Sequence, residues 1–251
     1  MLVLLPPSEG KTEASSGAPL DLDTLSAPSL TATRRRILDS LVKVSEGNAT
    51  RAAKRLGLGP TQLDELARNA ALREAPTARA DAVYTGVLYS AWDPASLSKA
   101  GRTYADETVA TASALFGVVR AGDHIPAYRL SAGVELPRLG PVAGLWRRSL
   151  GAALHELTDG GILIDLRSGA YVNLHKPSGD LADRTATIRV LNEVDGVRKV
   201  VSHFNKATKG EIVRALCEQQ VAASSAAELT GALRDLGWKV ELDGNRLDVV
   251  I

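Results

Sequence analysis

The chain opens with a short apolar run that stops abruptly at two prolines. Leu2 to Leu5 are all hydrophobic, and Pro6-Pro7-Ser8-Glu9-Gly10-Lys11-Thr12 follows them directly. This pattern predicts a buried strand that ends in a tight turn. Beyond the turn, a connection rich in Ser, Gly, Ala and Pro reaches about Leu30.

Apolar residues at spacings of three and four dominate the next stretch. They predict helices, and Asn48 and Pro60 are placed to begin two of them. The predicted helices cover residues 31–43, 49–56, 60–72, 94–99, 105–114 and 145–157. Residues 115–119 have the composition of a buried strand, whereas residues 84–89 fit either a strand or a loop.

Turn residues separate strand-like runs in the last third of the chain. Gly169, Gly196 and Gly244 each lie between two such runs, which predicts three hairpins. The hairpins pair residues 162–166 with 170–174, 185–191 with 198–203, and 238–242 with 246–251. Helical spacing covers 206–221 and 226–236. Hairpins interleaved with helices in no regular order predict an α+β fold with a mixed sheet, in a single domain over residues 1–251.

Composition excludes several classes of protein. The 251 residues are 45% hydrophobic, enough for a substantial core. The opening apolar run is too short for a signal peptide or a membrane span, so we expect a cytoplasmic protein with no membrane partner. The single cysteine, Cys217, excludes an intramolecular disulfide, and four scattered histidines form no metal-ligand spacing. We therefore expect neither a bound metal nor a cofactor.

A net charge of +1 conceals an uneven distribution of charge along the chain. Residues 31–80 carry ten lysines and arginines against five acids, and residues 111–150 carry five against two. The first thirty residues are acidic on balance. This asymmetry predicts a basic face on a nearly neutral molecule, although charge runs are also typical of solvated surfaces.

The turn over residues 6–12 collects groups that can bind an anion. Ser8, Glu9 and Lys11 place a hydroxyl, a carboxylate and an ammonium at the end of a strand, where binding groups often gather. Gly10-Lys11-Thr12 also ends like a phosphate-binding loop, but the full pattern needs a glycine at Leu5 and a helix afterwards. The alternative is a structural turn with a solvated Lys11.

Two glycines between predicted helices indicate a second anion-binding element. The sequence Leu56-Gly57-Leu58-Gly59 has the pattern of a helix-hairpin-helix turn, in which Gly57 and Gly59 let the backbone approach a phosphate closely. Nearby Arg51, Lys54 and Arg55 would add direct charge contacts with little sequence preference and a strong dependence on salt. Two such glycines are also a common way to end a helix.

Aromatic and guanidinium groups surround the segment 122–126. Arg120, Tyr128 and Arg129 suit bases and phosphates alike, although Tyr128 can equally be a core residue and Arg129 a structural ion pair. On the predicted 162–174 hairpin, Asp165 shares a strand face with other polar residues and is a further candidate for a polar site.

No catalytic arrangement is evident in the sequence. Ser8 has no histidine and aspartate pattern beside it, and Cys217 lies within a predicted helix. Whether the protein is an enzyme is therefore left open.

Several segments spread over nearly the whole chain carry a family resemblance. They are Leu4-Leu5-Pro6-Pro7-Ser8-Glu9-Gly10-Lys11-Thr12, Tyr84-Thr85-Gly86, Leu115-Phe116-Gly117-Val118-Val119-Arg120, Tyr128-Arg129-Leu130 and Lys206-Ala207-Thr208-Lys209-Gly210. Together they resemble the YaaA family, named for a protein of the bacterial hydrogen peroxide response. The resemblance implies an α+β fold with a helix-hairpin-helix-like element, a basic cleft that binds double-stranded DNA, and a part in iron homeostasis and in limiting oxidative damage. It also implies that the cleft is lined by Lys11, Arg120, Tyr128, Arg129, Lys206 and Lys209.

One segment departs from the family pattern and keeps a second hypothesis open. Where the family usually reads Asn-Leu-Ala-Ser followed by Glu-Tyr, this chain has Asp165-Leu166-Arg167-Ser168 followed by Gly169-Ala170-Tyr171. The first hypothesis is a DNA-binding stress protein. The second is an enzyme that acts on a nucleotide-like or other anionic small molecule in the same cleft. Direct iron binding has no ligand cluster in the sequence to support it.

Overall fold

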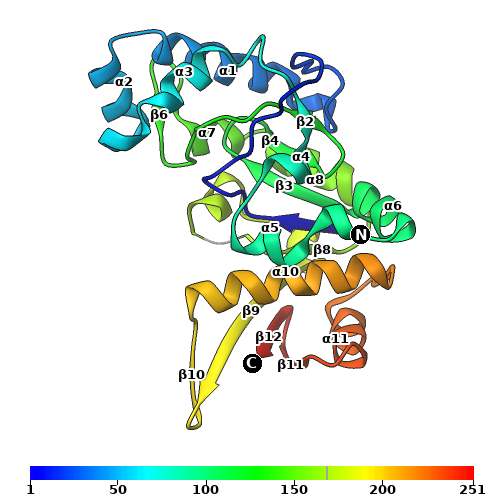
Figure 1. Ribbon diagram of the computed structural model, residues 1–251. Helices are drawn as coiled ribbons and strands as arrows, with labels where there is room; N and C mark the ends of the chain where they lie inside the picture. The colour runs from blue at the N-terminus through cyan, green and yellow to red at the C-terminus, as the bar shows by residue number, and fades with distance from the viewer. Residues whose placement is uncertain (168) are drawn as a thin grey trace.

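A mixed sheet of eight strands forms the centre of the computed structural model, which describes residues 1–167 and 169–251 (Figure 1). Its strands follow the order β11-β12-β9-β8-β1-β3-β4, and β10 pairs with β9 outside this path. The strands are β1 (Leu2–Leu5), β3 (Val109–Ser113), β4 (Gly117–Arg120), β8 (Leu163–Asp165), β9 (Thr185–Val194), β10 (Val197–Lys199), β11 (Lys239–Asp243) and β12 (Arg246–Val250). The predicted α+β class with a mixed sheet is confirmed.

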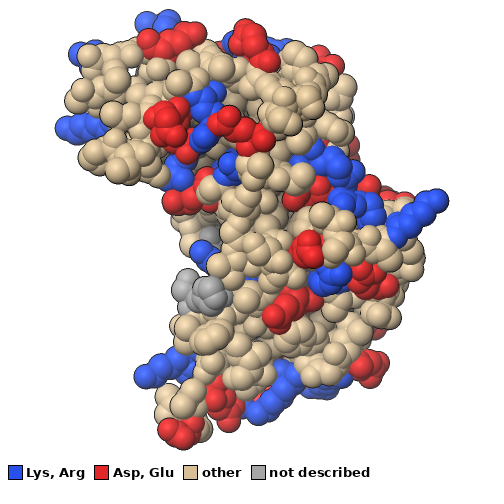
Figure 2. All heavy atoms as spheres, in the orientation of Figure 1, with Lys and Arg blue, Asp and Glu red and all other residues tan. Residues whose placement is uncertain are grey.

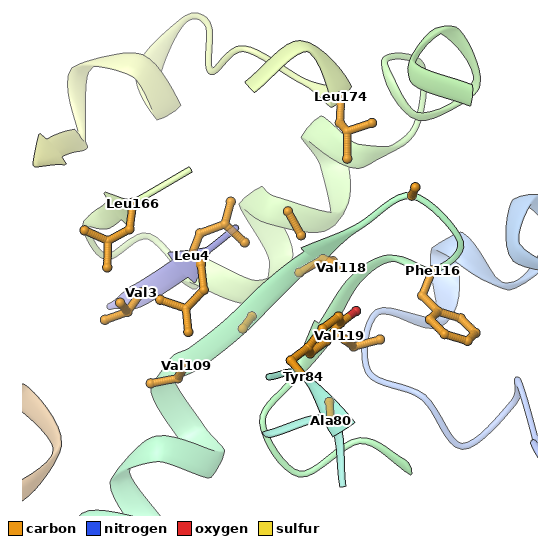
Figure 3. Close-up of a cluster of buried hydrophobic side chains, with 14 of the residues drawn as sticks. Val3, Leu4, Ala80, Tyr84, Val109, Phe116, Val118, Val119, Leu166 and Leu174 are labelled. Atoms are coloured by element: carbon orange, nitrogen blue, oxygen red, sulfur yellow. The ribbon is translucent and has the colours of Figure 1, made fainter. Parts of the chain in front are cut away.

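Parallel pairing surrounds the first strand. β1 lies between β3 and β8 and runs parallel to both, and β9 and β12 continue the parallel part of the sheet. Every residue of β1 is buried, as expected for a strand covered on both faces. Figure 3 shows Val3 and Leu4 in this core near Val109 and Leu166. The carboxyl ends of β1, β3 and β8 therefore meet at one edge of the sheet.

Helices and two small hairpins complete the fold. The α-helices are α1 (Thr31–Ser45), α2 (Ala49–Leu56), α3 (Asp64–Ala70), α4 (Ala80–Val83), α5 (Val87–Trp92), α6 (Lys99–Thr108), α7 (Val142–Trp146), α8 (Leu150–Thr158), α9 (Asp180–Asp183), α10 (Ser202–Glu218) and α11 (Ala226–Asp235). The 3-10 helices are η1 (Pro28–Leu30), η2 (Pro60–Gln62), η3 (Pro94–Ser96) and η4 (Gly169–Leu174). The small pairings join β2 (Ala78–Arg79) to β5 (His124–Ile125) and β6 (Glu135–Leu136) to β7 (Gly140–Pro141).

The elements divide between two ends of the molecule. Figure 1 shows α1, α2, α3 and β6 at one end, and β9 to β12 with α11 at the other. Helix α10 packs along α5 between them. None of the described helices is long and apolar enough to cross a membrane.

Several predicted elements are confirmed closely. β1 and α2 have the predicted bounds, and the Asn48 side chain caps α2 by accepting the backbone N–H of Arg51 at 3.1 Å. The hairpins β9–β10 and β11–β12 form at the predicted turns. The second strand of the β9–β10 hairpin is shorter than predicted, because α10 already begins at Ser202.

The predicted hairpin over 162–174 is wrong. β8 lies between β1 and β9, so neither of its edges is free to pair with residues 170–174, which form η4 instead. Arg167 fixes this conformation by donating to the backbone oxygens of Tyr171 and His175, at 3.2 and 3.0 Å. Ser168, within the predicted turn, lies outside the described residues.

Other predicted boundaries also differ. The predicted helix 105–114 is wrong, since α6 ends at Thr108 and residues 109–113 form β3 between β1 and β4. The helix predicted over 60–72 is split into η2 and α3, and that over 145–157 into α7 and α8. Of residues 84–89, left open between strand and loop, 84–86 connect α4 to α5 and 87–89 form the first turn of the α5 helix.

Candidate functional site

The loop over residues 6–12 crosses the edge where β1, β3 and β8 end. Ser8 Oγ accepts the backbone N–H of Thr85 at 2.9 Å, and Lys11 forms an isolated β-bridge with Tyr84. Tyr89 donates its hydroxyl to the backbone oxygen of Pro6 at 2.9 Å. The segment 84–89 therefore holds the loop in place over the strand ends.

The Lys11 amine lies against two aromatic rings. Its Nζ is 4.2 Å from the ring centroid of Tyr128 and 5.4 Å from that of Tyr84. It donates to the backbone oxygens of Ser8 and Glu9, at 2.9 and 3.3 Å. Such placement combines cation–π attraction with the removal of water from the amine.

Burial and nearby cations determine the protonation of Lys11. Loss of hydration, followed by the positive charge of Arg129, lowers the pKa of Lys11 to about 7, although Glu65 and Glu9 oppose the shift. Arg129 Nη2 is itself paired with Glu9 Oε2 at 3.1 Å. The site therefore holds an amine that titrates near neutral pH beside an arginine.

Beneath the amine, phenol and serine hydroxyls form a buried chain. Tyr128 Oη lies 2.7 Å from Ser113 Oγ and 3.0 Å from Tyr84 Oη. Ser113 Oγ also accepts the backbone N–H of Phe116 at 2.9 Å. Burial raises the pKa values of Tyr84 and Tyr128, so both phenols are neutral and act through hydrogen bonds.

Tyr128→Phe is expected to lower the free energy of unfolding by about 1.5 kcal/mol, because two buried hydroxyls lose a partner. The phenyl ring under Lys11 is retained. Urea denaturation followed by tryptophan fluorescence measures the effect, and a variant as stable as wild type would contradict the assigned hydroxyl chain.

Asn69 supports this site and was missed in the sequence. Its fully buried side chain accepts the backbone N–H of Arg129 and donates to the same residue's carbonyl, both at 2.9 Å. This pair of bonds fixes the backbone that carries Tyr128 and Arg129. A signal was present, since Asn69 lies three residues after the buried Leu66 on α3, where helical spacing places an apolar residue.

A second polar cluster lies at the end of β8. Arg167 donates to both carboxylate oxygens of Asp165, at 2.9 and 2.7 Å, and both side chains are buried. Lys209 of α10 donates to the backbone oxygen of Leu166 at 3.0 Å. Burial lowers the pKa of Lys209 to about 8, against the opposing effect of Asp165. The Asp165 carboxylate is thus ion-paired with Arg167 and is not free.

Tyr171 lies between the two clusters. Its backbone oxygen accepts from Arg167, and the charges of Glu9 and Arg129 both act on its phenol. Burial raises the pKa of the Tyr171 phenol to about 12. The structure therefore brings Ser8, Glu9, Lys11, Tyr128, Arg129, Asp165 and Lys209 to one edge of the sheet.

Arg120, a predicted cleft residue, lies elsewhere. Arg120 pairs with Ala110 near the beginning of β3, at the opposite edge of the sheet, because β4 runs antiparallel. Its guanidinium donates to the backbone oxygens of Glu107 and Leu157. Lys206 is exposed on α10, one turn before Lys209.

A basic concavity lies at the α1–α3 end of the molecule, and Figure 2 shows lysine and arginine side chains, with acidic ones among them, along the outer edge of this lobe. We call it the basic groove. It is a hollow of about 600 Å³ between α1, α2 and the β6–β7 hairpin. Its charged lining consists of Arg36, Asp39, Lys43, Arg51, Arg55 and Arg138. Asp39 is ion-paired with Arg73, so the cations predominate.

Residues 56–59, predicted to form a helix-hairpin-helix turn, join α2 to the 3-10 helix η2, and the structure does not confirm that motif. Gly57 has a φ of 67° and ends the helix in the left-handed conformation. The backbone N–H of Gly59 donates to Gln62 Oε1 at 3.0 Å, so this amide already has a partner. Lys54 is exposed on α2, whereas Arg51 and Arg55 line the basic groove. Sequence reasoning missed Arg36, Lys43 and Arg138, which come from two other elements.

The fold and these two sites define an α+β protein with a polar site at the strand ends and a basic groove on its helical lobe. Residues 1–243 match the family described as "Peroxide stress protein YaaA". A UPF0246 protein of Streptomyces coelicolor is 48% identical over 97% of this chain and 93% of its own length. One from Corynebacterium efficiens is 42% identical over 100% of this chain and 98% of its own. The chain belongs to the YaaA family of peroxide stress proteins.

Proposed function

We propose that this peroxide stress protein binds double-stranded DNA through the basic groove and the exposed cations of α2, and thereby helps to limit iron-dependent damage. The observation that supports the proposal is the convergence of five cationic side chains from three elements around one concavity. Its single carboxylate is already engaged by Arg73. Cations gathered in this way gain most from a partner that carries closely spaced negative charges.

The expected mode of binding is contact with phosphates. Arg36, Lys43, Arg51 and Arg55 project from two helices, and no aromatic side chain lines the groove among the described residues. Phosphate contacts position a protein on DNA and carry little sequence information. Affinity is therefore expected to depend on salt more than on base sequence.

Charge reversal in the groove tests this proposal. Arg51→Glu with Arg138→Glu is expected to weaken duplex binding on the order of a hundredfold and to reduce the salt slope by about 2, since each phosphate contact contributes about 0.9. Fluorescence anisotropy with a labelled duplex at several salt concentrations measures both quantities.

A matched control carries the same change in charge elsewhere. Lys99 and Lys176 are exposed and lie outside the groove, so Lys99→Glu with Lys176→Glu should leave affinity within about twofold of wild type. Equal losses of affinity in the two double variants would mean that net charge alone causes the effect. That result would overturn the groove assignment. Lys54→Glu, which keeps the groove residues Arg51 and Arg55, separates the exposed cation of α2 from the groove itself.

A second candidate function is an enzyme that acts on a small anionic molecule at the Lys11 loop. The observation that favours it is the meeting of Lys11, Tyr128 and Arg129 at the carboxyl ends of parallel strands. Ligands of open α/β sheets bind at this edge. Titration with mono- and dinucleotides tests it, with saturable binding by wild type and loss of binding in Lys11→Ala as the expected result.

A further inference from the structure

The carboxylates near Lys11 form ion pairs with arginines. Arg129 is paired with Glu9, and Arg68 is paired with both Glu13 and Glu65. Among the described residues Lys11 forms no ion pair, and its direct partners are two backbone oxygens and two tyrosine rings. A lysine that only anchored a loop would gain from a carboxylate partner, and here each such group is bound to another cation.

The hydrogen bonds of Lys11 suit the neutral amine. A neutral amine has two N–H groups and one lone pair, and Lys11 Nζ has two acceptors, the backbone oxygens of Ser8 and Glu9. Both N–H groups of the neutral amine thus have an acceptor, and no hydrogen bond from a described residue to the Nζ lone pair is present. The pKa of about 7 means that a large share of Lys11 is neutral at physiological pH. The groups that act on this titration are Arg129, Glu65, Glu9 and Arg68.

We propose that Lys11 is a nucleophilic amine that condenses with a small anionic carbonyl compound, an aldehyde or 2-oxo acid bearing a carboxylate. This proposal rests on the second candidate function and names its substrate class. The Nζ lone pair attacks the carbonyl carbon, and the carbonyl electron pair moves to oxygen. A proton moves from nitrogen to this oxygen and gives a carbinolamine. A proton from the medium then converts the hydroxyl into water, which leaves. The remaining proton on nitrogen returns to the medium. The product is a neutral imine between Nζ and the former carbonyl carbon, so atoms and charges balance without an oxidant or reductant.

Arg129 is the reason why we expect the ligand to carry a negative charge. Its side chain is 13% exposed, while that of its partner Glu9 is 83% exposed. Glu9 can therefore turn into solvent at little cost and release the guanidinium to a ligand carboxylate, which it binds in a bidentate manner. A carbonyl carbon attached to that carboxylate would come close to Lys11, since Lys11 and Arg129 both contact Glu9, one at its backbone oxygen and the other at its carboxylate.

Reductive trapping with glyoxylate and sodium cyanoborohydride tests the proposal. At pH 7 fewer than about one in a thousand ordinary exposed lysines are neutral, so Lys11 is expected to be carboxymethylated on the order of tenfold faster than Lys54 or Lys99. Peptide mass spectrometry locates the label on wild type and on Lys11→Arg, which keeps the positive charge. The preference for Lys11 over exposed lysines should be largest up to about pH 7 and should fall towards pH 10, where the exposed lysines also lose their protons.

Arg129→Gln separates the role of the anion from the reactivity of the amine. This variant should lose the preference of Lys11 for glyoxylate over acetaldehyde, since acetaldehyde has no carboxylate. A label spread evenly over the lysines at pH 7, or a preference for Lys11 that does not fall by pH 10, overturns the proposal. If Lys11→Ala loses nucleotide binding while wild-type Lys11 shows no preferential label, the second candidate function stands and only the carbonyl chemistry falls.

Discussion

Arg34→Leu is expected to lower the free energy of unfolding by about 4 kcal/mol, one of the two largest effects expected of a single substitution in this protein. Arg34 lies on α1 with no exposed surface, although it belongs to a run of three arginines. Its guanidinium donates to the backbone oxygens of Phe116, Ser26 and Val118, at 2.9, 2.7 and 2.8 Å. Leucine fills a similar volume but removes a donor from three carbonyl oxygens in the interior, of which that of Phe116 keeps the backbone N–H of Val118.

The neighbouring arginine is the control for this experiment. Arg35 is more than half exposed and lies 3.6 Å from the exposed Asp23, so Arg35→Leu should change stability by no more than about 0.5 kcal/mol. Urea denaturation of both variants gives the comparison. Equal stability of the two variants would mean that Arg34 does not link α1 to the β3–β4 turn.

Gly210→Ala is expected to destabilise the protein by about 3 kcal/mol, because it forces α10 away from α5. A Cβ atom at Gly210 would lie 2.2 Å from the backbone oxygen of Leu88 and 2.9 Å from the backbone nitrogen of Trp92. Neither is the end of a flexible side chain, so a helix must move. The same shift would displace Lys209 from Leu166.

A second helical glycine provides the opposite expectation. A Cβ atom at Gly231 within α11 meets nothing within 4 Å, and Gly231→Ala should stabilise the protein by about 0.5–1 kcal/mol through reduced freedom of the unfolded chain. Thermal or urea denaturation of both variants distinguishes the destabilisation caused by close packing at Gly210 from the gain in helix propensity at Gly231. If Gly210→Ala were as stable as Gly231→Ala, the close approach of α10 to α5 would be wrong.

Part of the candidate site was predictable because its signal is local. The prolines and glycine of the 6–12 turn, directly after an apolar run, mark a loop at a strand end, and the structure places Lys11 there. Asp165 was identified as a polar residue on a strand, but its pairing with Arg167 depends on where η4 lies. The basic groove was foreseen only through Arg51 and Arg55, since Arg138 approaches them from a hairpin about eighty residues later.

Residues of the same charge that lie close together in the sequence can have different environments in the fold. Arg34 is a core residue and Arg35 a surface one, although both belong to the basic stretch 31–80. Arg120 and Arg129 flank one loop, yet the antiparallel direction of β4 places Arg120 at the opposite edge of the sheet from Arg129. Counting charges along the chain therefore overestimates what a basic face can offer a partner.

The sequence by itself determined the local structure of this protein: the buried β1 strand, the Asn48-capped α2 helix, the two carboxyl-terminal hairpins and the turn that carries Lys11. These follow from side-chain period, capping and turn residues, which act over a few positions. Only the tertiary structure decided the parallel placement of β8 between β1 and β9, the burial of Arg34 and the lowered pKa of Lys11. Burial and electrostatic environment arise from contacts between residues far apart in the chain, and no local pattern specifies them.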